Sequence, residues 1–393
     1  MKTWISRVQN IPREFALFLI AVSFGAFSQG IMDSSLNNFL NETFSITDLQ
    51  RSLTEIPREI PGFLVVFVSA MFFFMGSRRL GFLANVFCAV GALCIGLFSF
   101  SFPLMLIWLF IYSLGQHIFL PLNSSIGMDL AKDGRMGRRL GQLSGAANFA
   151  SIGGFFLVLV LFKFLKLNFR TVFMISAVSL IIASVFMFKM KPDQPVPGHL
   201  RLKLRKEYGL FYWLSILYGT RKQIFLTFAP WVLVSVFKQK TEVIAGLLAA
   251  GGIIGIFVKP LIGRTIDHFG EKAVLMSEAF LLIFVCGGYG LSGKVFPGEI
   301  AFIVVCVCYV MDQILMAAGM ARATYLKKIA LADNEVASTL AMGTTIDHVF
   351  SISIAVTGGI LWKAFGYQAV FMLGAGIAMV NLFSAARISY KKV

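Results

Sequence analysis

The stretch that decides the fold is residues 263–272, "GRTIDHFGEK". It is a short polar segment between two apolar runs, residues 241–262 and 273–291. Each run is long enough to cross a hydrocarbon core of about 30 Å as a helix. The glycines of the segment allow a tight reversal, and its acid and cation, Asp267 and Lys272, can hold neighbouring helix ends through their dipoles. The segment therefore predicts a hairpin of two membrane-spanning helices.

Apolar runs of this length recur along the whole chain. Of its 393 residues, 58% are hydrophobic and 14% are charged, whereas soluble domains average about 25% charged residues. Windows of about 20 residues predict an all-α, multi-pass membrane protein with short loops. The twelve predicted spans are residues 14–40, 48–75, 82–100, 103–129, 140–162, 167–188, 209–236, 241–262, 273–291, 298–326, 335–361 and 367–386.

The cations of the chain predict how it is oriented. The formal net charge is +16, and the positive charges gather in alternate loops, all on one side if every span crosses. By the positive-inside rule both termini are cytoplasmic. We therefore attribute the excess of positive charge to the membrane topology and to contact with anionic lipid, and we expect no nucleic acid among the partners. The cations are Lys2, Arg7, Arg13, Arg78 and Arg79, those within 132–139, 189–206 and 322–328, Arg264, Lys272, and those within 387–392.

Several classes of chemistry have no counterpart in the sequence. The five cysteines all lie within spans, where they behave as small apolar groups, and no zinc spacing occurs. No phosphate-binding loop pattern and no catalytic triad are present. We expect no enzyme activity, no metal and no cofactor.

The chain also contains an internal duplication. The segment "RTVFMISA" (170–177) opens the sixth span and "QAVFMLGA" (368–375) opens the twelfth, at an offset of 198. A Pro- and Lys/Arg-rich stretch lies between the halves. We expect an amino-terminal six-helix bundle over 1–189, a cytoplasmic linker over 190–208, and a carboxy-terminal six-helix bundle over 209–393.

The polar loop carries a family resemblance. Its pattern of Gly263, Asp267, Gly270 and Lys272, inside a duplicated twelve-span chain, resembles the major facilitator superfamily of transporters. The resemblance implies two pseudo-symmetric six-helix halves that rock about a midplane site, with this loop as a cytoplasmic gate. The copy in the first half, "GSRRLG" (76–81), is two residues shorter and lacks the acid, so a latch there is in doubt.

The resemblance further implies that spans one, four, seven and ten line the central cavity. An ionisable residue inside a membrane costs roughly 2.5–3.5 kcal/mol and normally faces a cavity or a partner. Each of these four spans carries at least one. They are Asp33, His117, the adjacent pair Arg221 and Lys222, and Asp312; the flanking spans two and eleven add Glu55, Arg58, Glu59, Asp347 and His348.

Arg221 is the favoured contact for an anionic group of the substrate, because a guanidinium offers two parallel hydrogen bonds. The alternative is a structural ion pair that holds the two halves together. Lys222 lies about 100° around the helix, so it pairs with an acid of a neighbouring helix or serves the proton pathway. Tyr218, His117 and Asp312 are further candidates for substrate contact, against packing or counter-ion roles.

The proton-coupling candidates are Asp33, Asp347, His348 and Glu59. Burial raises the pKa of a carboxylate and a nearby cation lowers it, so alternating exposure and pairing can load and release a proton. The alternative is that these acids are counter-ions. In the second span, the spacing of residues 51–59 places several charges on one helix face, which predicts either an outward-opening vestibule or an intra-helix salt network.

Together these features predict a proton-coupled symporter of a small anionic or zwitterionic organic solute, a monomer in the cell membrane of a bacterium. Its partners are the solute, protons and lipid. One alternative is proton-driven export of amphipathic compounds or lipids, although the fifth span lacks the Gly-Pro signature of drug antiporters. An uncoupled facilitator is another. A receptor or scaffold is disfavoured by the buried charge.

Overall fold

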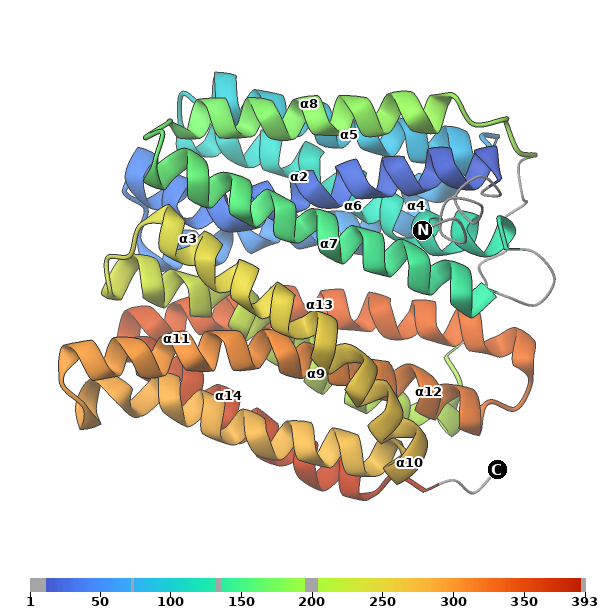
Figure 1. The fold of residues 1–393 in the computed structure, drawn as a ribbon. Helices are drawn as coiled ribbons and strands as arrows, with labels where there is room; N and C mark the ends of the chain where they lie inside the picture. The colour runs from blue at the N-terminus through green and yellow to red at the C-terminus, as the bar shows by residue number, and fades with distance from the viewer. Residues whose placement is uncertain (1–11, 72–73, 132–135, 195–203, 390–393) are drawn as a thin grey trace, which may run out of the picture. The chain divides into compact units, whose positions relative to one another are not determined.

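The computed structural model of the protein describes residues 12–71, 74–131, 136–194 and 204–389. These residues form helices and loops, with no strand among them (Figure 1). Nine helices of the described chain are long and apolar enough to cross a membrane. The predicted class, an all-α membrane protein, is confirmed. The count of twelve spans and the cytoplasmic position of the termini stay predictions.

The chain divides into two compact units. Unit 1 comprises Met1–Leu36 and Leu64–Gly198, and unit 2 comprises Asn37–Phe63 and His199–Val393. Residues 37–63, which the sequence places with the first bundle, thus make their contacts with the second. The predicted linker 190–208 is described at residues 190–194 and 204–208, and its remainder lies outside the described residues, as do Lys2 and Arg7.

Unit 1 is built from long apolar helices that pack around a core of Phe15, Phe18, Val22 and Met187. The side chain of Asn168 caps one of them by accepting a hydrogen bond of 3.0 Å from the backbone N–H of Thr171, which satisfies a free donor at the helix start. The helices are the first part of α2 (Arg13–Phe44), the last part of α4 (Glu55–Met71), α5 (Ser77–Phe98), α6 (Phe102–Asp129), α7 (Met136–Lys163) and α8 (Phe169–Phe188).

Unit 2 contains the rest of α2 and α4 and the carboxy-terminal helices. The short helix α3 (Asp48–Leu53) begins with a capping box, in which Thr47 and Gln50 satisfy each other's backbone donors. It packs against α13 (Asp333–Phe365) and α9 (Gly209–Trp231). The other elements are η1 (Lys206–Tyr208), α9 (Gly209–Trp231), η2 (Val232–Val236, a π-helix), α10 (Thr241–Val295), α11 (Gly298–Leu315), η3 (Met316–Gly319), α12 (Met320–Ile329), α13 (Asp333–Phe365) and α14 (Tyr367–Ala386).

The predicted hairpin lies in α10. A straight helix of its 55 residues would be about 80 Å long, more than twice the hydrocarbon core. The helix instead reverses at Gly270, whose φ of 81° is left-handed, and Figure 1 shows the two arms that result. A residue with a Cβ is strained in this conformation, so the glycine of the motif is required by the turn.

Candidate functional site

Two adjacent cations on α9 point to different helices of unit 2. The Arg221 side chain is 3% exposed, and its guanidinium lies 3.3 Å from Glu278 Oε1 on α10 and 3.1 Å from Asp312 Oδ1 on α11. Lys222 turns to α13 instead, as the 100° step between neighbours requires. The prediction that the two cations face different partners is confirmed.

Arg221 is therefore held by two carboxylates of its own unit. The predicted alternative, an ion pair between the two halves, is wrong about the partners, because both acids follow α9 in the same unit. Glu278 is buried in α10, and the Arg221 guanidinium balances its charge there. The predicted substrate contact of Arg221 stays a prediction, and this triplet occupies its guanidinium.

Lys222 and Asp347 form the second ion pair. The Lys222 Nζ lies 2.9 Å from Oδ1 and 3.1 Å from Oδ2 of Asp347, and the Ser351 hydroxyl donates to the same carboxylate. The helices approach closely here because residue 219 is a glycine: an added Cβ would lie 2.9 Å from the Asp347 Cα, closer than real contacts allow. The glycine at position 219 therefore lets Lys222 and Asp347 come close enough to form the ion pair.

A third cation, Arg322 of α12, lies beside this pair. Its guanidinium carbon sits 3.4 Å from the centre of the Tyr218 ring, a cation–π contact. Its Nε is buried and has no hydrogen-bond partner, and no described residue forms an ion pair with it. The sequence groups Arg322 with the cytoplasmic cations of 322–328, because two lysines, Lys327 and Lys328, follow it closely.

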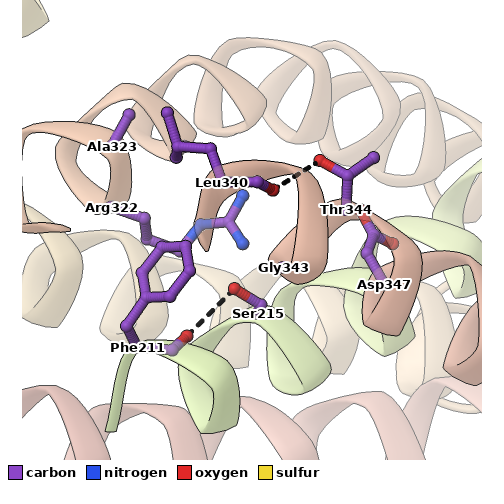
Figure 2. A pocket seen from close by; sticks show the side chains of 9 residues that line it. Phe211, Ser215, Arg322, Ala323, Leu340, Gly343, Thr344 and Asp347 are labelled. Carbon is purple, nitrogen blue, oxygen red and sulfur yellow. Dashed lines mark hydrogen bonds between the residues drawn. The ribbon is translucent and has the colours of Figure 1, made fainter. Parts of the chain in front are cut away.

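Arg322 projects into a cavity of about 90 Å³. Figure 2 shows its guanidinium in the space bordered by α9, α12 and α13. A water molecule takes up about 30 Å³, so the cavity fits a group of the size of a carboxylate or phosphate. The residues that border it are Phe211, Ser215, Gly319, Arg322, Ala323, Leu340, Gly343, Thr344 and Asp347. Because Lys222 neutralises Asp347, Arg322 leaves the walls with a net positive charge.

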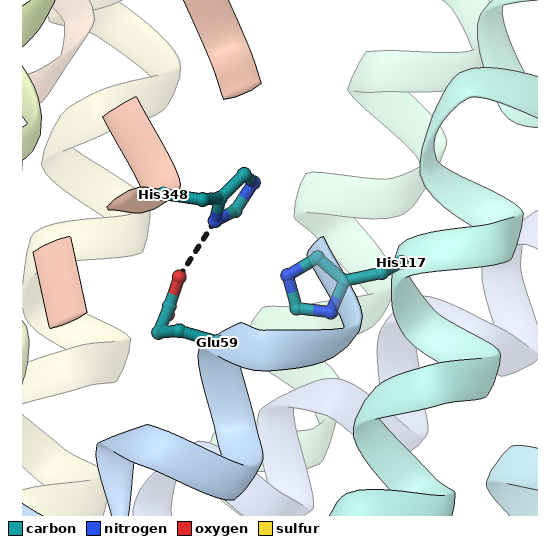
Figure 3. Close-up of side chains that lie close together, drawn as sticks. All are labelled: Glu59, His117 and His348. Atoms are coloured by element: carbon teal, nitrogen blue, oxygen red, sulfur yellow. Dashed lines mark hydrogen bonds and ion pairs between the residues drawn. The ribbon is translucent and has the colours of Figure 1, made fainter. Parts of the chain in front are cut away.

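A second pair of candidates meets near the start of α4. The Nδ1 of His348 lies 2.7 Å from Glu59 Oε2, and both side chains are buried (Figure 3). The two residues are 289 positions apart in the chain. Their contact joins α4 to α13 within unit 2, and it pairs two of the four predicted proton-coupling residues.

Three of the charged residues of 51–59 are buried, namely Arg51, Glu55 and Glu59. Arg51 lies 2.6 Å from Glu55 Oε1 and donates to Asn37 of α2, while Gln223 of α9 donates to Glu55 Oε2 at 2.9 Å. Arg51 is 1% and Glu55 is 0% exposed. The predicted vestibule lining is wrong for these two residues, because their charges pair with each other and pack against α2 and α9. Arg58 lies 3.4 Å from Glu55, in agreement with the predicted salt network.

The remaining candidates of the first half lie in unit 1. Asp33 of α2 accepts a hydrogen bond of 2.7 Å from Gln29, and Gln29 in turn bonds to Tyr112 and Gln116 of α6. The Nδ1 of His117 lies 3.0 Å from the Ser113 hydroxyl. These contacts form a polar patch of amide, phenol and carboxylate groups, which the sequence did not reveal because glutamines carry no charge.

In the polar loop the ion pair involves other residues than expected. Asp267 is exposed, and no described residue forms an ion pair with it or with Lys272. The neighbouring Glu271 is 1% exposed and binds Lys328 of α12 at 2.8 Å. The gate role of the motif residues stays a prediction.

In the corresponding segment of unit 1, residues 76–81, Arg78 contacts acids from other parts of the chain. Arg78 lies 3.2 Å from Glu14 and 2.8 Å from Asp129, and its backbone N–H donates to Asp193 at 3.0 Å. These three acids belong to other segments of unit 1. The lost acid of this motif copy is thus compensated by tertiary contacts.

Comparison with known proteins shows that the chain is similar to transporters in sequence and in fold. The family model described as Major Facilitator Superfamily matches residues 18–331. No curated protein matches the chain.

Among solved structures, a nucleoside transporter, NupG, is 15% identical with a TM-score of 0.74, over 96% of this chain and 99% of that one. A D-xylose-proton symporter is 14% identical with a TM-score of 0.72, over 97% and 99%. A POT family transporter in complex with a thioalcohol conjugated peptide is 13% identical with a TM-score of 0.73, over 95% of each chain. Identities this low show a shared fold.

Proposed function

The chain belongs to the Major Facilitator Superfamily, and from this premise we propose that it is a proton-coupled symporter of a small anionic or zwitterionic organic solute. One observation carries the proposal: Arg322 has no anionic partner within the described residues, and it lies in a cavity beside the Lys222–Asp347 pair. A guanidinium suits a carboxylate or phosphate because it donates two parallel hydrogen bonds. Arg322 is the anion anchor in this proposal.

The neighbouring ion pair supplies a route to coupling. When Asp347 accepts a proton, Lys222 loses its counter-ion and the cavity gains a second positive charge. A unit charge about 6 Å from an anion contributes about 3 kcal/mol at an effective dielectric constant of about 20. Proton and anion therefore favour each other's binding, which is the thermodynamic condition for moving both in one direction.

The Glu59–His348 pair is the second proton-binding element of the proposal. A carboxylate and an imidazole 2.7 Å apart can share a proton, and both groups belong to helices that the family resemblance places beside the cavity. Asp33 remains the candidate of unit 1. The symport direction agrees with the printed description of one structural neighbour, the D-xylose-proton symporter.

A thermal-stability screen in detergent tests the anion anchor. Monocarboxylates, dicarboxylates, phosphate esters and amino acids are added to the purified protein. We expect at least one to raise the melting temperature, and Arg322→Gln to abolish the shift. The matched control is Arg264→Gln, at an exposed arginine of α10, and we expect this variant to keep the shift. If Arg322→Gln retains the shift, Arg322 is not the anchor.

The coupling is tested in proteoliposomes with the stabilising compound. We expect accumulation when the side that supplies substrate is acidic, and Asp347→Asn to exchange the compound without accumulating it. Accumulation driven by the opposite gradient would indicate the exporter, and equilibration that ignores the gradient would indicate a facilitator. A protein that moves none of the stabilising compounds is not a transporter of this class.

A further inference from the structure

A second cavity of unit 2 takes no part in the proposed function. Its volume is about 320 Å³, within the range of sites that hold small organic ligands. It is bordered by the end of α2, the start of α3, the π-helix η2 and the last turns of α13. It shares no residue with the cavity of Arg322.

The cavity has an acidic group fixed in its wall. The indole Nε1 of Trp231 donates to Asp48 Oδ1 at 2.6 Å, and the Trp231 side chain is 1% exposed. This bond holds the carboxylate in place and leaves its second oxygen with no donor among the described residues. Ser235 adds a buried hydroxyl that also has no hydrogen-bond partner. Two unfilled acceptors therefore face a space that is large enough for a ligand.

The backbone of this region is irregular where those groups lie. Ser235 belongs to a five-residue π-helix, a conformation that is rare and frequent at functional sites. Lys238 has a φ of 52°, which is unfavourable for a residue with a Cβ. Its side chain is exposed at the edge of the cavity, and no described residue forms an ion pair with it.

The chemistry of the lining defines the ligand. A carboxylate, a free hydroxyl and the indole rings of Trp231 and Trp362 favour an ammonium group, by charge, hydrogen bonding and cation–π attraction. Lys238 at the edge favours a carboxylate. We propose that this cavity is a second binding site, separate from that of Arg322, for a small zwitterion of the amino-acid type, with its ammonium at Asp48 and its carboxylate at Lys238.

Tryptophan fluorescence of the purified full-length protein measures binding directly, because two indoles line the cavity. The probes are leucine, leucinamide, which lacks the carboxylate, and N-acetylleucine, which lacks the ammonium. We expect leucine to change the emission, leucinamide to bind more weakly, and N-acetylleucine to bind at least about tenfold more weakly than leucine, because it loses a charge-assisted hydrogen bond.

Two variants and two controls identify the site. Asp48→Asn keeps an oxygen acceptor for Trp231 and removes the charge, and we expect at least about tenfold weaker leucine binding. Lys238→Ala should weaken leucine and leave leucinamide unchanged. Glu299→Gln, at an exposed acid of α11, and Arg322→Gln should leave the response intact.

The controls also separate this inference from the proposed function. If Arg322→Gln abolishes the fluorescence change, leucine binds in the cavity of Arg322 and the second site is refuted. The same conclusion follows if Asp48→Asn binds leucine normally or if none of the three probes changes the emission. Transport that depends on Arg322 is unaffected by any of these results.

Discussion

Lys222 of α9 and Asp347 of α13 lie 2.9 Å apart as an ion pair, with both side chains about seven-eighths buried (15% and 13% exposed). Removing one partner of a buried pair leaves the other charge uncompensated, which costs about 3 kcal/mol. Replacing both leaves no such charge.

We expect Asp347→Asn alone to lower the free energy of unfolding by about 3 kcal/mol, and the double variant Lys222→Gln with Asp347→Asn to recover most of it. A double-mutant cycle of denaturation in detergent measures the coupling. Additive single effects would show that the contact contributes no interaction energy.

Gly219→Ala should separate this ion pair without changing a charge. The added methyl would lie 2.9 Å from both Cα and Cγ of Asp347, so α13 or the carboxylate has to move. We expect loss of accumulation on a pH gradient and a lower melting temperature. Gly287→Ala is the control, since a Cβ there meets nothing within 4 Å. Equal behaviour of the two variants would contradict the tight approach.

Arg51 and Arg58 bind the same oxygen of Glu55 and provide a matched comparison. Arg51 is buried at 2.6 Å, whereas Arg58 is 22% exposed at 3.4 Å. We expect Arg51→Gln to lower the free energy of unfolding by about 3 kcal/mol and Arg58→Gln by less than about 1 kcal/mol. Thermal denaturation of the two variants decides, and a reversed order would mean that Arg58 neutralises the buried acid.

Arg221 offers a test of structure against substrate binding. Its removal leaves Glu278 and Asp312 buried together, so we expect Arg221→Met to fail to fold into a monodisperse protein. The triple variant with Glu278→Gln and Asp312→Asn should fold again, because no charge is left. Size-exclusion chromatography distinguishes these outcomes. A folded Arg221→Met protein that has lost only its ligand response would favour the substrate role instead.

Gly270→Ala should destabilise the hairpin of α10 by about 1 kcal/mol or more, because φ is 81° there. Gly263 belongs to the same motif, but a Cβ meets nothing within 4 Å and its φ is not left-handed. Gly263→Ala is therefore expected to be neutral or stabilising in the same thermal assay. A neutral Gly270→Ala would mean that the turn rearranges easily.

The fold was predictable from the sequence because its two strongest patterns are local. The apolar runs set the helices, and the polar loop at Gly270 sets a reversal. The prediction that Arg221 and Lys222 face different partners also followed from helix geometry alone. These properties depend on neighbours within about one helical turn, which a sequence displays directly.

The site was less predictable because it depends on contacts between distant segments. Arg322 lies five and six residues before Lys327 and Lys328, and its contact with the Tyr218 ring distinguishes it from these two lysines. Glu278 and Arg51 look like residues near a helix end, yet a partner on another helix buries each of them. The charges in the apolar runs show that these residues need partners, but only the tertiary structure shows which residues the partners are.

The order of the charges along the chain has a consequence for biosynthesis. Both cations of α9 are translated before their acids, and Asp347 follows Lys222 by 125 residues. A newly made α9 thus carries two charges that each cost roughly 2.5–3.5 kcal/mol to insert alone. We expect this helix to stay at the translocon until α10, α11 and α13 have emerged, so that membrane insertion and assembly of unit 2 form a single event.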